Sequence, residues 1–304
     1  MCIRGFYEWI ELIIKGVHYG LTLLYSYLLP VINLDERAGG FIFSIEYGEL
    51  KGLECRFNES TLETTCSISG SPSAPSLERI LGLEKHWLFR EVCSRLNIEK
   101  CIANQVTLVY EPLYKKIVAY SIYLSRNTDY YVNTLKWVRE AVLKKYIDSQ
   151  SYIPREFNAV RDQIDNVVTN GKTPLEEVLG LMKIPGFGVK SANAYLLHVY
   201  GLTEYAPIDR HYAKLLGKIT LISKSACLRN GRLYCKQCSI NCPYRHAQSR
   251  FGVLNGVIQS LIYVYGRLKN PRKTSIEEIL VGSREYYIDE FEELITKVKN
   301  VYQV

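Results

Sequence analysis

The sequence lacks an apolar run long enough to cross a membrane. Its most apolar stretch, residues 13–34, is interrupted by Lys15, His18 and Pro30, whereas a spanning helix needs about 20 consecutive apolar residues. Two glutamates and Lys15 within residues 8–15 also break the apolar core that a secretory signal would need. We therefore expect an intracellular protein with no membrane partner.

Acidic residues are absent from one long segment. Between Arg210 and Ile276 there is no Asp or Glu, although these 67 residues carry 13 of the 38 Lys and Arg residues. The rest of the chain is mildly acidic, with 25 basic and 31 acidic residues. One strongly basic region beside an acidic remainder is the charge distribution of a polyanion-binding surface.

Internal repeats and low-complexity tracts are also absent, and 304 residues with 47% hydrophobic content are enough for two cores. Residues 40–69 alternate as β-strands do, the stretch 70–76 reads as a linker, and a helical pattern begins at Leu77. Thr173, followed by Pro and two acids, predicts a helix start. The predicted units are residues 1–76 with an antiparallel β domain, a helical domain over 77–276 and a helical tail over 277–304.

Residues 184–211 hold the most informative motif. A Pro-Gly-Phe-Gly turn containing Gly186 and Gly188 leads into a predicted helix, whose free backbone N–H groups can hold a phosphate. Lys190 follows two residues after the second glycine, and Asp209 comes 19 residues later. A lysine amine can be a nucleophile with a carboxylate as its electrostatic partner. We predict that Lys190 and Asp209 are catalytic; the alternative for Lys190 is a simple phosphate contact.

This motif resembles that of the helix-hairpin-helix, Gly-Pro-Asp superfamily of DNA base-excision glycosylases. In that superfamily the lysine marks bifunctional members, which release a damaged base and then cut the DNA backbone. The 19-residue spacing and the β-then-helical order are similar to the 8-oxoguanine DNA glycosylase branch. The resemblance covers most of the chain except residues 1–34 and 277–304. It implies an α+β fold with a small antiparallel β domain followed by an all-helical glycosylase domain.

The resemblance also implies roles for individual residues. Lys190 would attack the sugar C1′, and Asp209 would stabilise the positive charge that develops on the sugar. His211 would contact the phosphate on the 5′ side of the lesion. Asn127 would fill the gap left by the flipped base, with Arg126 as the neighbouring candidate. Alternatively, Asn127 is an ordinary helix cap and His211 a helix-face residue.

A base pocket is implied by two residues of one helix face. Gln259 and Tyr263 are four residues apart, so both can reach the same pocket. In the family such a glutamine reads the Watson–Crick edge of the flipped base, and the aromatic residue stacks on it. A backbone carbonyl for the N7 hydrogen of 8-oxoguanine would come from Gly39 or Gly40. The alternative is a core-facing stripe with a solvated glutamine. Family members carry an arginine that contacts the cytosine opposite the lesion. In this sequence that position is near Val132, which leaves the preference for the opposite base open.

Nine cysteines fall into two groups. Within residues 224–246, four are spaced x7, x2 and x3, which suits a [4Fe–4S] cluster or a tetrahedral zinc ion; these are Cys227, Cys235, Cys238 and Cys242. We predict the cluster, with zinc or two disulfides as alternatives. Endonuclease III-like enzymes carry a similar loop, although theirs follows the last helix of the domain. The other cysteines are expected to be buried and reduced, even though Cys55 and Cys66 flank a possible hairpin.

Together these patterns predict a monomeric base-excision-repair glycosylase with abasic-site (AP) lyase activity. It would act on double-stranded DNA that contains an oxidised base, with 8-oxoguanine as the favoured substrate. One alternative is an endonuclease III-like glycosylase/lyase for oxidised pyrimidines, which the cysteine loop favours. Another is a DNA-structure-binding protein without catalysis, against which Lys190 and Asp209 argue.

Overall fold

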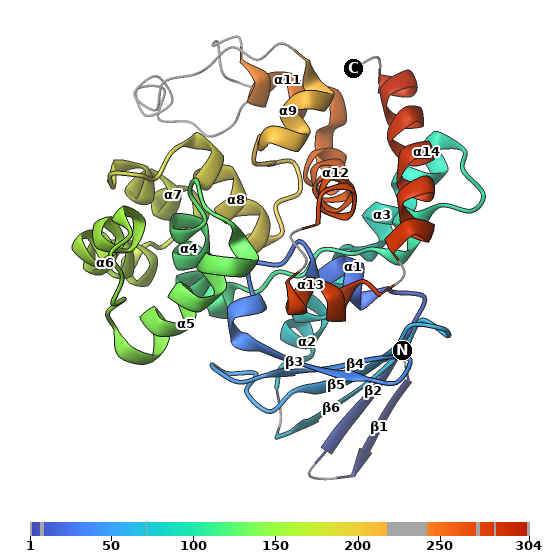
Figure 1. Cartoon of the computed structure of the whole chain (residues 1–304), viewed down its shortest axis with the longest axis horizontal. Helices are drawn as coiled ribbons and strands as arrows, with labels where there is room; N and C mark the ends of the chain where they lie inside the picture. The colour runs from blue at the N-terminus through green and yellow to red at the C-terminus, as the bar shows by residue number, and fades with distance from the viewer. Residues whose placement is uncertain are drawn as a thin grey trace.

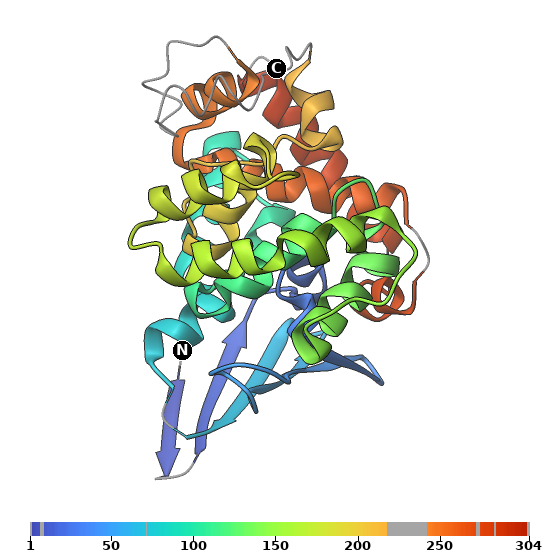
Figure 2. The same cartoon turned by 90° about the vertical axis from the view of Figure 1, so that its left-hand side faces the viewer.

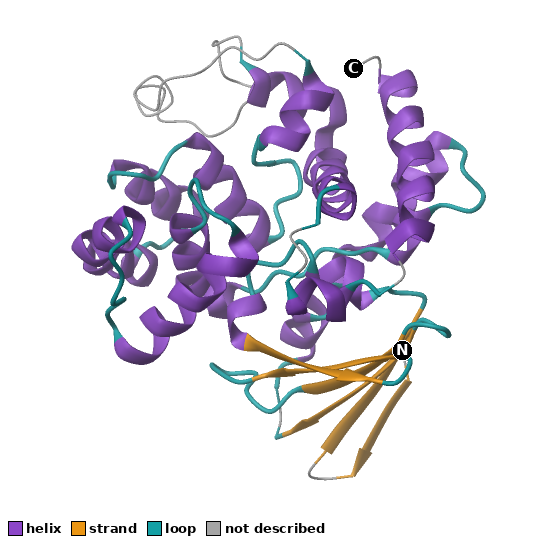
Figure 3. Cartoon of the chain, in the orientation of Figure 1, coloured by secondary structure: helices purple, strands orange, loops and turns teal. Residues whose placement is uncertain are grey.

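An antiparallel sheet forms one end of the molecule, and helices pack over one of its faces (Figure 1; Figure 2). Figure 3 shows the strands gathered in one layer and the helices in the rest of the molecule. The computed structural model describes residues 2–6, 9–70, 72–217, 242–271, 274–282 and 284–302. Among them, no helix is both long and apolar enough to cross a bilayer.

Six strands make up the sheet, in the order β1-β2-β6-β5-β4-β3, and every neighbouring pair is antiparallel. Burial alternates along β4 and β6, as expected for strands with one covered face. The predicted β content of residues 40–69 is confirmed. The strands are β1 (Cys2–Phe6), β2 (Trp9–Lys15), β3 (Ile32–Arg37), β4 (Gly40–Ile45), β5 (Glu54–Asn58) and β6 (Glu63–Ser69).

Helices make up most of the rest of the described chain, joined by loops and turns. The predicted start at Thr173 is confirmed, because its side chain accepts the N–H of Glu176 at 3.2 Å and Pro174 opens the helix. The α-helices are α1 (Tyr19–Leu23), α2 (Ala74–Ile80), α3 (His86–Leu96), α4 (Lys115–Leu124), α5 (Leu135–Lys144), α6 (Tyr152–Asn170), α7 (Pro174–Lys183), α8 (Val189–Tyr200), α9 (Arg210–Leu216), α11 (Pro243–Phe251), α12 (Asn255–Lys269), α13 (Ser275–Leu280) and α14 (Arg284–Tyr302). Shorter turns are η1 (Leu29–Val31), η2 (Leu83–Lys85), η3 (Ile102–Gln105), η4 (Pro112–Tyr114), the π-helical η5 (Tyr130–Thr134) and η7 (Gly252–Leu254).

The segment between β2 and β3 leaves the sheet and enters the helical layer. Its helix α1 is fully buried and packs on α13, while η1 packs on α5. Arg139 of α5 holds the segment by donating to the carbonyls of Pro30 and Ile32, at 3.1 and 2.9 Å. This excursion carries residues 24–27 to the centre of the helical layer. The domain boundaries at residues 76 and 276 stay predictions, because α1 and η1 precede residue 76 yet pack with helices.

Four of the cysteines expected to be reduced form disulfides. Cys55 and Cys66 are directly opposite each other on β5 and β6, with Cα atoms 4.0 Å apart. Cys93 of α3 joins Cys101, with Cα atoms 5.8 Å apart. All four are buried, as predicted, but the expectation of free thiols was wrong. Strand register brings Cys55 and Cys66 together, close enough for a disulfide.

Candidate active site

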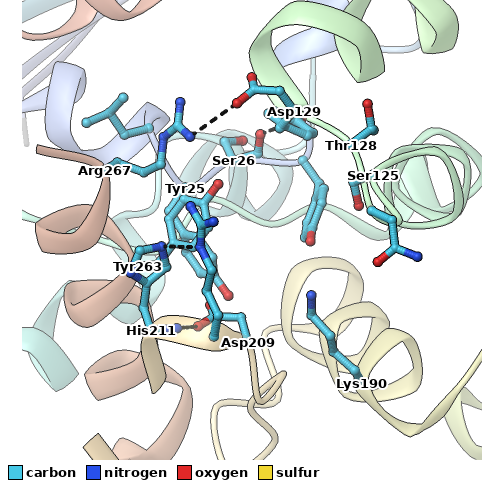
Figure 4. A pocket seen from close by; sticks show the side chains of 15 residues that line it. Tyr25, Ser26, Ser125, Thr128, Asp129, Lys190, Asp209, His211, Tyr263 and Arg267 are labelled. Carbon is cyan, nitrogen blue, oxygen red and sulfur yellow. Dashed lines mark hydrogen bonds and ion pairs between the residues drawn. The ribbon is translucent and has the colours of Figure 1, made fainter. Parts of the chain in front are cut away.

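A cavity of about 540 Å³ lies in the helical layer, where segments distant in sequence converge (Figure 4). Its walls come from the segment after α1, the turn after α4, the first turn of α8, the start of α9 and one face of α12. The lining residues are Leu24, Tyr25, Ser26, Tyr27, Ser125, Asn127, Thr128, Asp129, Tyr130, Lys190, Asp209, Arg210, His211, Tyr263 and Arg267.

The Gly-rich hairpin joins α7 to α8, whose first turn carries the cavity-lining Lys190. Gly186 has φ of +88°, a left-handed conformation that favours glycine, and a Cβ there would lie 2.1 Å from Nη1 of Arg126. Gly188 is the N-cap of α8, and a Cβ there would meet no described atom within 4 Å. The space beside Gly188 is therefore open among the described residues, and the first N–H groups of α8, which have no partner within the helix, can bind a phosphate that approaches there.

Lys190 lies in the first turn of α8 and its side chain is exposed. Its amine points into the cavity, towards the turn after α4 (Figure 4). It forms no hydrogen bond or ion pair within the part of the chain that the structure describes. The amine is consequently free to meet a molecule that enters the cavity.

Asp209 is the N-cap of α9 and is held by three hydrogen bonds. Its Oδ1 accepts the backbone N–H groups of His211 and Tyr212 at 2.7 and 2.8 Å. Its Oδ2 accepts Nε2–H of Gln259 at 2.8 Å. Capping an N-terminus places the negative charge where the helix dipole stabilises it. The structure thus brings both predicted catalytic residues, Lys190 and Asp209, to one cavity.

Gln259 and Tyr263 face the same region from α12, but only Tyr263 lines the cavity. Gln259 is completely buried, and its Oε1 accepts the hydroxyl of Tyr25. The Tyr25 ring packs against Tyr263 at 4.8 Å between centroids. Each polar atom of the Gln259 amide therefore already has one hydrogen-bond partner. Recognition of a base edge by this amide stays a prediction.

Tyrosines at the back of the cavity were not predicted as site residues. Tyr25 and Tyr27 flank His198 of α8, with ring centroids 4.6 and 4.8 Å away. Burial lowers the pKa of His198 to about 3, so its ring is neutral. Burial is also the main cause that raises the pKa of Tyr27 to about 12. These hydroxyls stay protonated at neutral pH. The tyrosine-rich start of the chain was the available signal.

His211 and Arg267 complete the charged part of the cavity. The His211 ring lies against Gly266, where a Cβ would be 2.2 Å from Nδ1. Burial lowers the pKa of His211, whereas Asp209 acts in the opposite direction. Arg267 was not predicted; it is buried, lies 3.5 Å from Asp129 and pairs with a glutamate of α13. It ties α12 to the turn after α4.

That turn carries the two predicted gap-filling residues. Asn127 has φ of +50° and lines the cavity. Arg126 lies over the Tyr123 ring at 3.9 Å and bonds Glu156 of α6 at 2.9 Å. Because it also packs over Gly186, Arg126 joins the turn to the hairpin and is not free to enter a duplex in this conformation. Asn127 remains the candidate for gap filling.

Gly39 is not brought to the site. It lies in the tight turn between β3 and β4 with φ of +77°, and its carbonyl accepts the N–H of Glu59 at 2.9 Å. It is absent from the cavity lining, as is Gly40, which pairs with Asn58 in the sheet. The predicted contact with the base is therefore not supported for either glycine. Residues 24–27, from the segment after α1, do line the cavity.

The predicted metal ligands fall mostly outside the described residues. Cys227, Cys235 and Cys238 lie there, so the loop stays a prediction. Cys242 is described: it is buried, forms no disulfide with a described cysteine and caps α11 by accepting the N–H of Arg245 at 3.3 Å. No group of three or more candidate metal ligands occurs among the described residues.

Comparison with known proteins identifies the fold. No family model matches the sequence, and no curated protein matches it. An 8-oxoguanine glycosylase/lyase of Clostridium acetobutylicum, solved with double-stranded DNA containing cytosine opposite 8-oxoG, is similar with a TM-score of 0.58. That match has 12% identity and covers 89% of this chain and 99% of the other.

Two further structures give the same result. MBOgg1, solved with a low-affinity DNA ligand, has a TM-score of 0.56 and 13% identity, over 88% of this chain and 98% of its own. The apo-form of the clostridial enzyme has a TM-score of 0.56 and 11% identity, over 87% and 98%. At such low identity the likeness concerns the fold, and it confirms the predicted α+β class, a small antiparallel sheet followed by a helical glycosylase-like layer.

Proposed function

We propose that the chain is a base-excision DNA glycosylase with AP lyase activity that removes an oxidised base, in particular 8-oxoguanine. One observation carries the proposal: Lys190 and Asp209 line one cavity, behind a Gly-rich hairpin, on a fold shared with an 8-oxoguanine glycosylase/lyase. The exposed amine and the fixed carboxylate come from different helices. Their meeting at one cavity is what a nucleophile and its electrostatic partner require.

The chemistry follows from these two groups. The unprotonated amine of Lys190 forms a bond to the sugar C1′ while the glycosidic bond breaks, and the base leaves with the bonding electrons and takes up a proton. Opening of the sugar gives a Schiff base. Loss of the C2′ proton then expels the 3′ phosphate. The Asp209 carboxylate orients the attack of the amine and stabilises the positive charge on the sugar, both during base departure and in the protonated Schiff base that also forms at an abasic site.

The aromatic lining of the cavity supports the binding of a flipped base. The cavity is lined by the aromatic rings of Tyr25, Tyr27, Tyr130 and Tyr263, whose flat faces suit stacking. Asn127 stands at its edge on a turn in the left-handed conformation, where it can enter the space that the base vacates. The open N-terminus of α8 would hold a DNA phosphate beside Lys190.

The four-cysteine loop is a separate part of the proposal. Cys227, Cys235, Cys238 and Cys242 would hold a [4Fe–4S] cluster, and the buried thiol of Cys242 at the start of α11 suits one ligand. The cluster would brace a basic loop near the DNA. Anaerobically purified protein should contain about four iron atoms per chain. About one zinc ion per chain would instead assign the loop to zinc. Protein that contains neither iron nor zinc would refute the proposal that this loop binds a metal.

A panel of duplexes, each with one lesion, tests the proposed activity. Protein is incubated with 8-oxoguanine, thymine glycol, abasic or undamaged duplex, with and without borohydride, which reduces a Schiff base to a stable adduct. We expect base release and an adduct with 8-oxoguanine and an adduct with the abasic site. Preference for thymine glycol would favour the endonuclease III-like alternative. Binding without any adduct would leave a non-catalytic DNA-binding protein.

A further inference from the structure

The side-chain amide of Gln259 connects two other parts of the cavity wall. Gln259 is completely buried on α12, and its partners are Asp209 at the start of α9 and Tyr25 in the segment after α1. An ionised carboxylate can only accept hydrogen bonds, so the NH2 group of the amide must face Asp209. Its oxygen then faces Tyr25, whose hydroxyl must be the donor. The direction of both bonds is therefore fixed by chemistry.

Tyr25 is itself held in place. Its ring lies between His198, 4.6 Å away, and Tyr263, 4.8 Å away. Burial is the main cause that raises the pKa of Tyr25 well above its usual value, and the nearby Asp209 adds to the effect. Its hydroxyl consequently stays protonated and remains a donor at every pH at which the protein works.

The carboxylate of Asp209 is nearly saturated by these contacts. Two backbone N–H groups and the Gln259 amide donate three hydrogen bonds to it. An ionised carboxylate has acceptor positions for about four. The position that remains is available to the cavity, which Asp209 lines. Without the amide, Oδ2 would lose its only described side-chain partner, and the carboxylate could turn about its last bond.

We propose that Gln259 is a positioning residue for Asp209, and that Tyr25 sets the direction of the Gln259 amide. The inference rests on the proposed function and deepens it. It assigns to Gln259 a part in the chemistry at the sugar, distinct from recognition of the base edge. Because an abasic site has no base, a positioning role and a base-reading role differ in what they do to that substrate.

The variant Gln259→Glu tests the positioning role through the pH dependence of the reaction rate. At low pH the introduced carboxyl is protonated and can donate to Asp209 as the amide does. Burial and the adjacent Asp209 raise the pKa of such a carboxyl. Activity is therefore retained below that raised pKa and lost as the pH rises through it, when two carboxylates repel each other.

Other titratable groups face the pair and belong to both wild type and variant. They are Lys190 on α8, His211 and Tyr212 on α9, Tyr263 on α12, and Tyr25 and Tyr27 in the segment after α1. Arg210 and Arg267 add permanent positive charge. Since these groups are unchanged, the wild-type profile measured in parallel subtracts their contribution.

The test uses the full chain, with single-turnover rates on an 8-oxoguanine duplex and borohydride adduct formation on a pre-formed abasic duplex. Loss of a hydrogen bond to a charged group predicts that Gln259→Ala slows both reactions by about ten- to a hundredfold. Tyr25→Phe removes the donor that fixes the orientation of the Gln259 amide, so the amide can rotate. This variant should slow both reactions by about two- to tenfold. Gln259→Glu should approach wild type near about pH 5 and lose at least about tenfold near pH 8.

Matched controls separate positioning from a general loss of structure. Tyr19→Phe removes another buried hydroxyl, which donates to the carbonyl of Leu81 at 2.9 Å. Asn158→Asp replaces another side-chain amide by a carboxyl. The Asn158 amide, on α6, forms hydrogen bonds with the backbone N–H and carbonyl of Ile147 in the loop before that helix. Neither control should give the pH-dependent rescue, and thermal unfolding of each variant reports its stability.

Three results would overturn the inference while the proposed function stands. In the first, Gln259→Ala slows only 8-oxoguanine release and forms the abasic adduct at the wild-type rate. In the second, Gln259→Glu stays folded and shows no recovery at low pH. In the third, Tyr25→Phe matches wild type on both substrates. A wild-type protein that forms no adduct with either duplex would instead contradict the proposed function, and the inference with it.

Discussion

The two sides of the cavity are built in opposite ways. On the α9 and α12 side, Asp209 takes three hydrogen bonds, and its partner Gln259 is completely buried. On the α8 side, Lys190 is exposed and has no hydrogen bond or ion pair with any described residue. The carboxylate is fixed by the fold, whereas the amine is left to the substrate.

This difference matches what each group must do. A carboxylate that stabilises developing charge works best when it is already oriented, because no reorganisation is then needed during the reaction. An amine that forms a covalent bond must move towards the carbon atom it attacks, so a strong partner would hold it back. Breaking either side should therefore damage different properties, and the following variants are ordered by the size of the expected effect.

The largest effect is expected from Lys190→Gln. Removing the nucleophile should abolish base release and the borohydride adduct, while duplex binding, measured by fluorescence anisotropy, stays close to wild type. Lys183→Gln is the matched control, because Lys183 is an exposed lysine at the end of α7 on the other arm of the hairpin. An adduct at normal yield with Lys190→Gln would remove this residue from the chemistry.

Asp209→Asn tests the side of the cavity formed by α9 and α12, where the carboxylate is held by hydrogen bonds. Asparagine caps a helix as well as aspartate does, so the free energy of unfolding should change by less than about 1 kcal/mol. Loss of the charge should slow base release by about 10²- to 10³-fold. Single-turnover rates and urea unfolding check the two parts separately. A variant that is strongly destabilised, or one that keeps its rate, would contradict the role given to the carboxylate.

Two glycine substitutions compare a packed position with an open one. Gly266→Ala should displace the His211 ring, which a Cβ would approach to 2.2 Å, and lower the free energy of unfolding by about 1–3 kcal/mol. Gly188→Ala meets no described atom within 4 Å. It should change stability little but weaken DNA binding, because its methyl group points where a phosphate would approach. Equal stability losses would contradict this distinction.

The smallest effect is expected from Arg126→Ala. It removes the stacking on Tyr123 and the bond to Glu156, a pair at the protein surface. The cost in stability should be about 1 kcal/mol. If Arg126 joins the turn to the hairpin without contacting phosphate, the salt dependence of duplex binding should not change. A slope reduced by about one would instead show a direct phosphate contact.

Much of the site could be predicted because its signals are local. The hairpin, Lys190 and Asp209 lie within 26 residues, and their spacing carries the information. The role of Tyr25 could not be predicted in this way, since its partner Gln259 is 234 positions away. Sequence spacing placed Gln259 and Tyr263 on one helix face. It could not tell that Tyr25 covers the amide.

The fold shows the same limit. Strands β4 to β6 followed from alternation. In β2, Leu12 and Ile14 are buried while Glu11 and Lys15 are exposed, but the exposed, apolar Ile13 breaks the alternation in the sequence. The Cys55–Cys66 disulfide depends on the register between β5 and β6, which alternation alone does not settle. Gly39 lies in the turn between β3 and β4, outside the cavity lining, and its contact with a base stays a prediction without support from the structure.

The most direct test of the account is to locate the covalent bond. The wild-type protein is trapped with borohydride on a duplex carrying 8-oxoguanine, digested, and analysed by mass spectrometry for the peptide that carries the sugar remnant. We expect the adduct on Lys190, dependent on the lesion and lost in Lys190→Gln. An adduct on another lysine, or none on any lesion in the panel, would contradict the claim that this cavity performs the reaction.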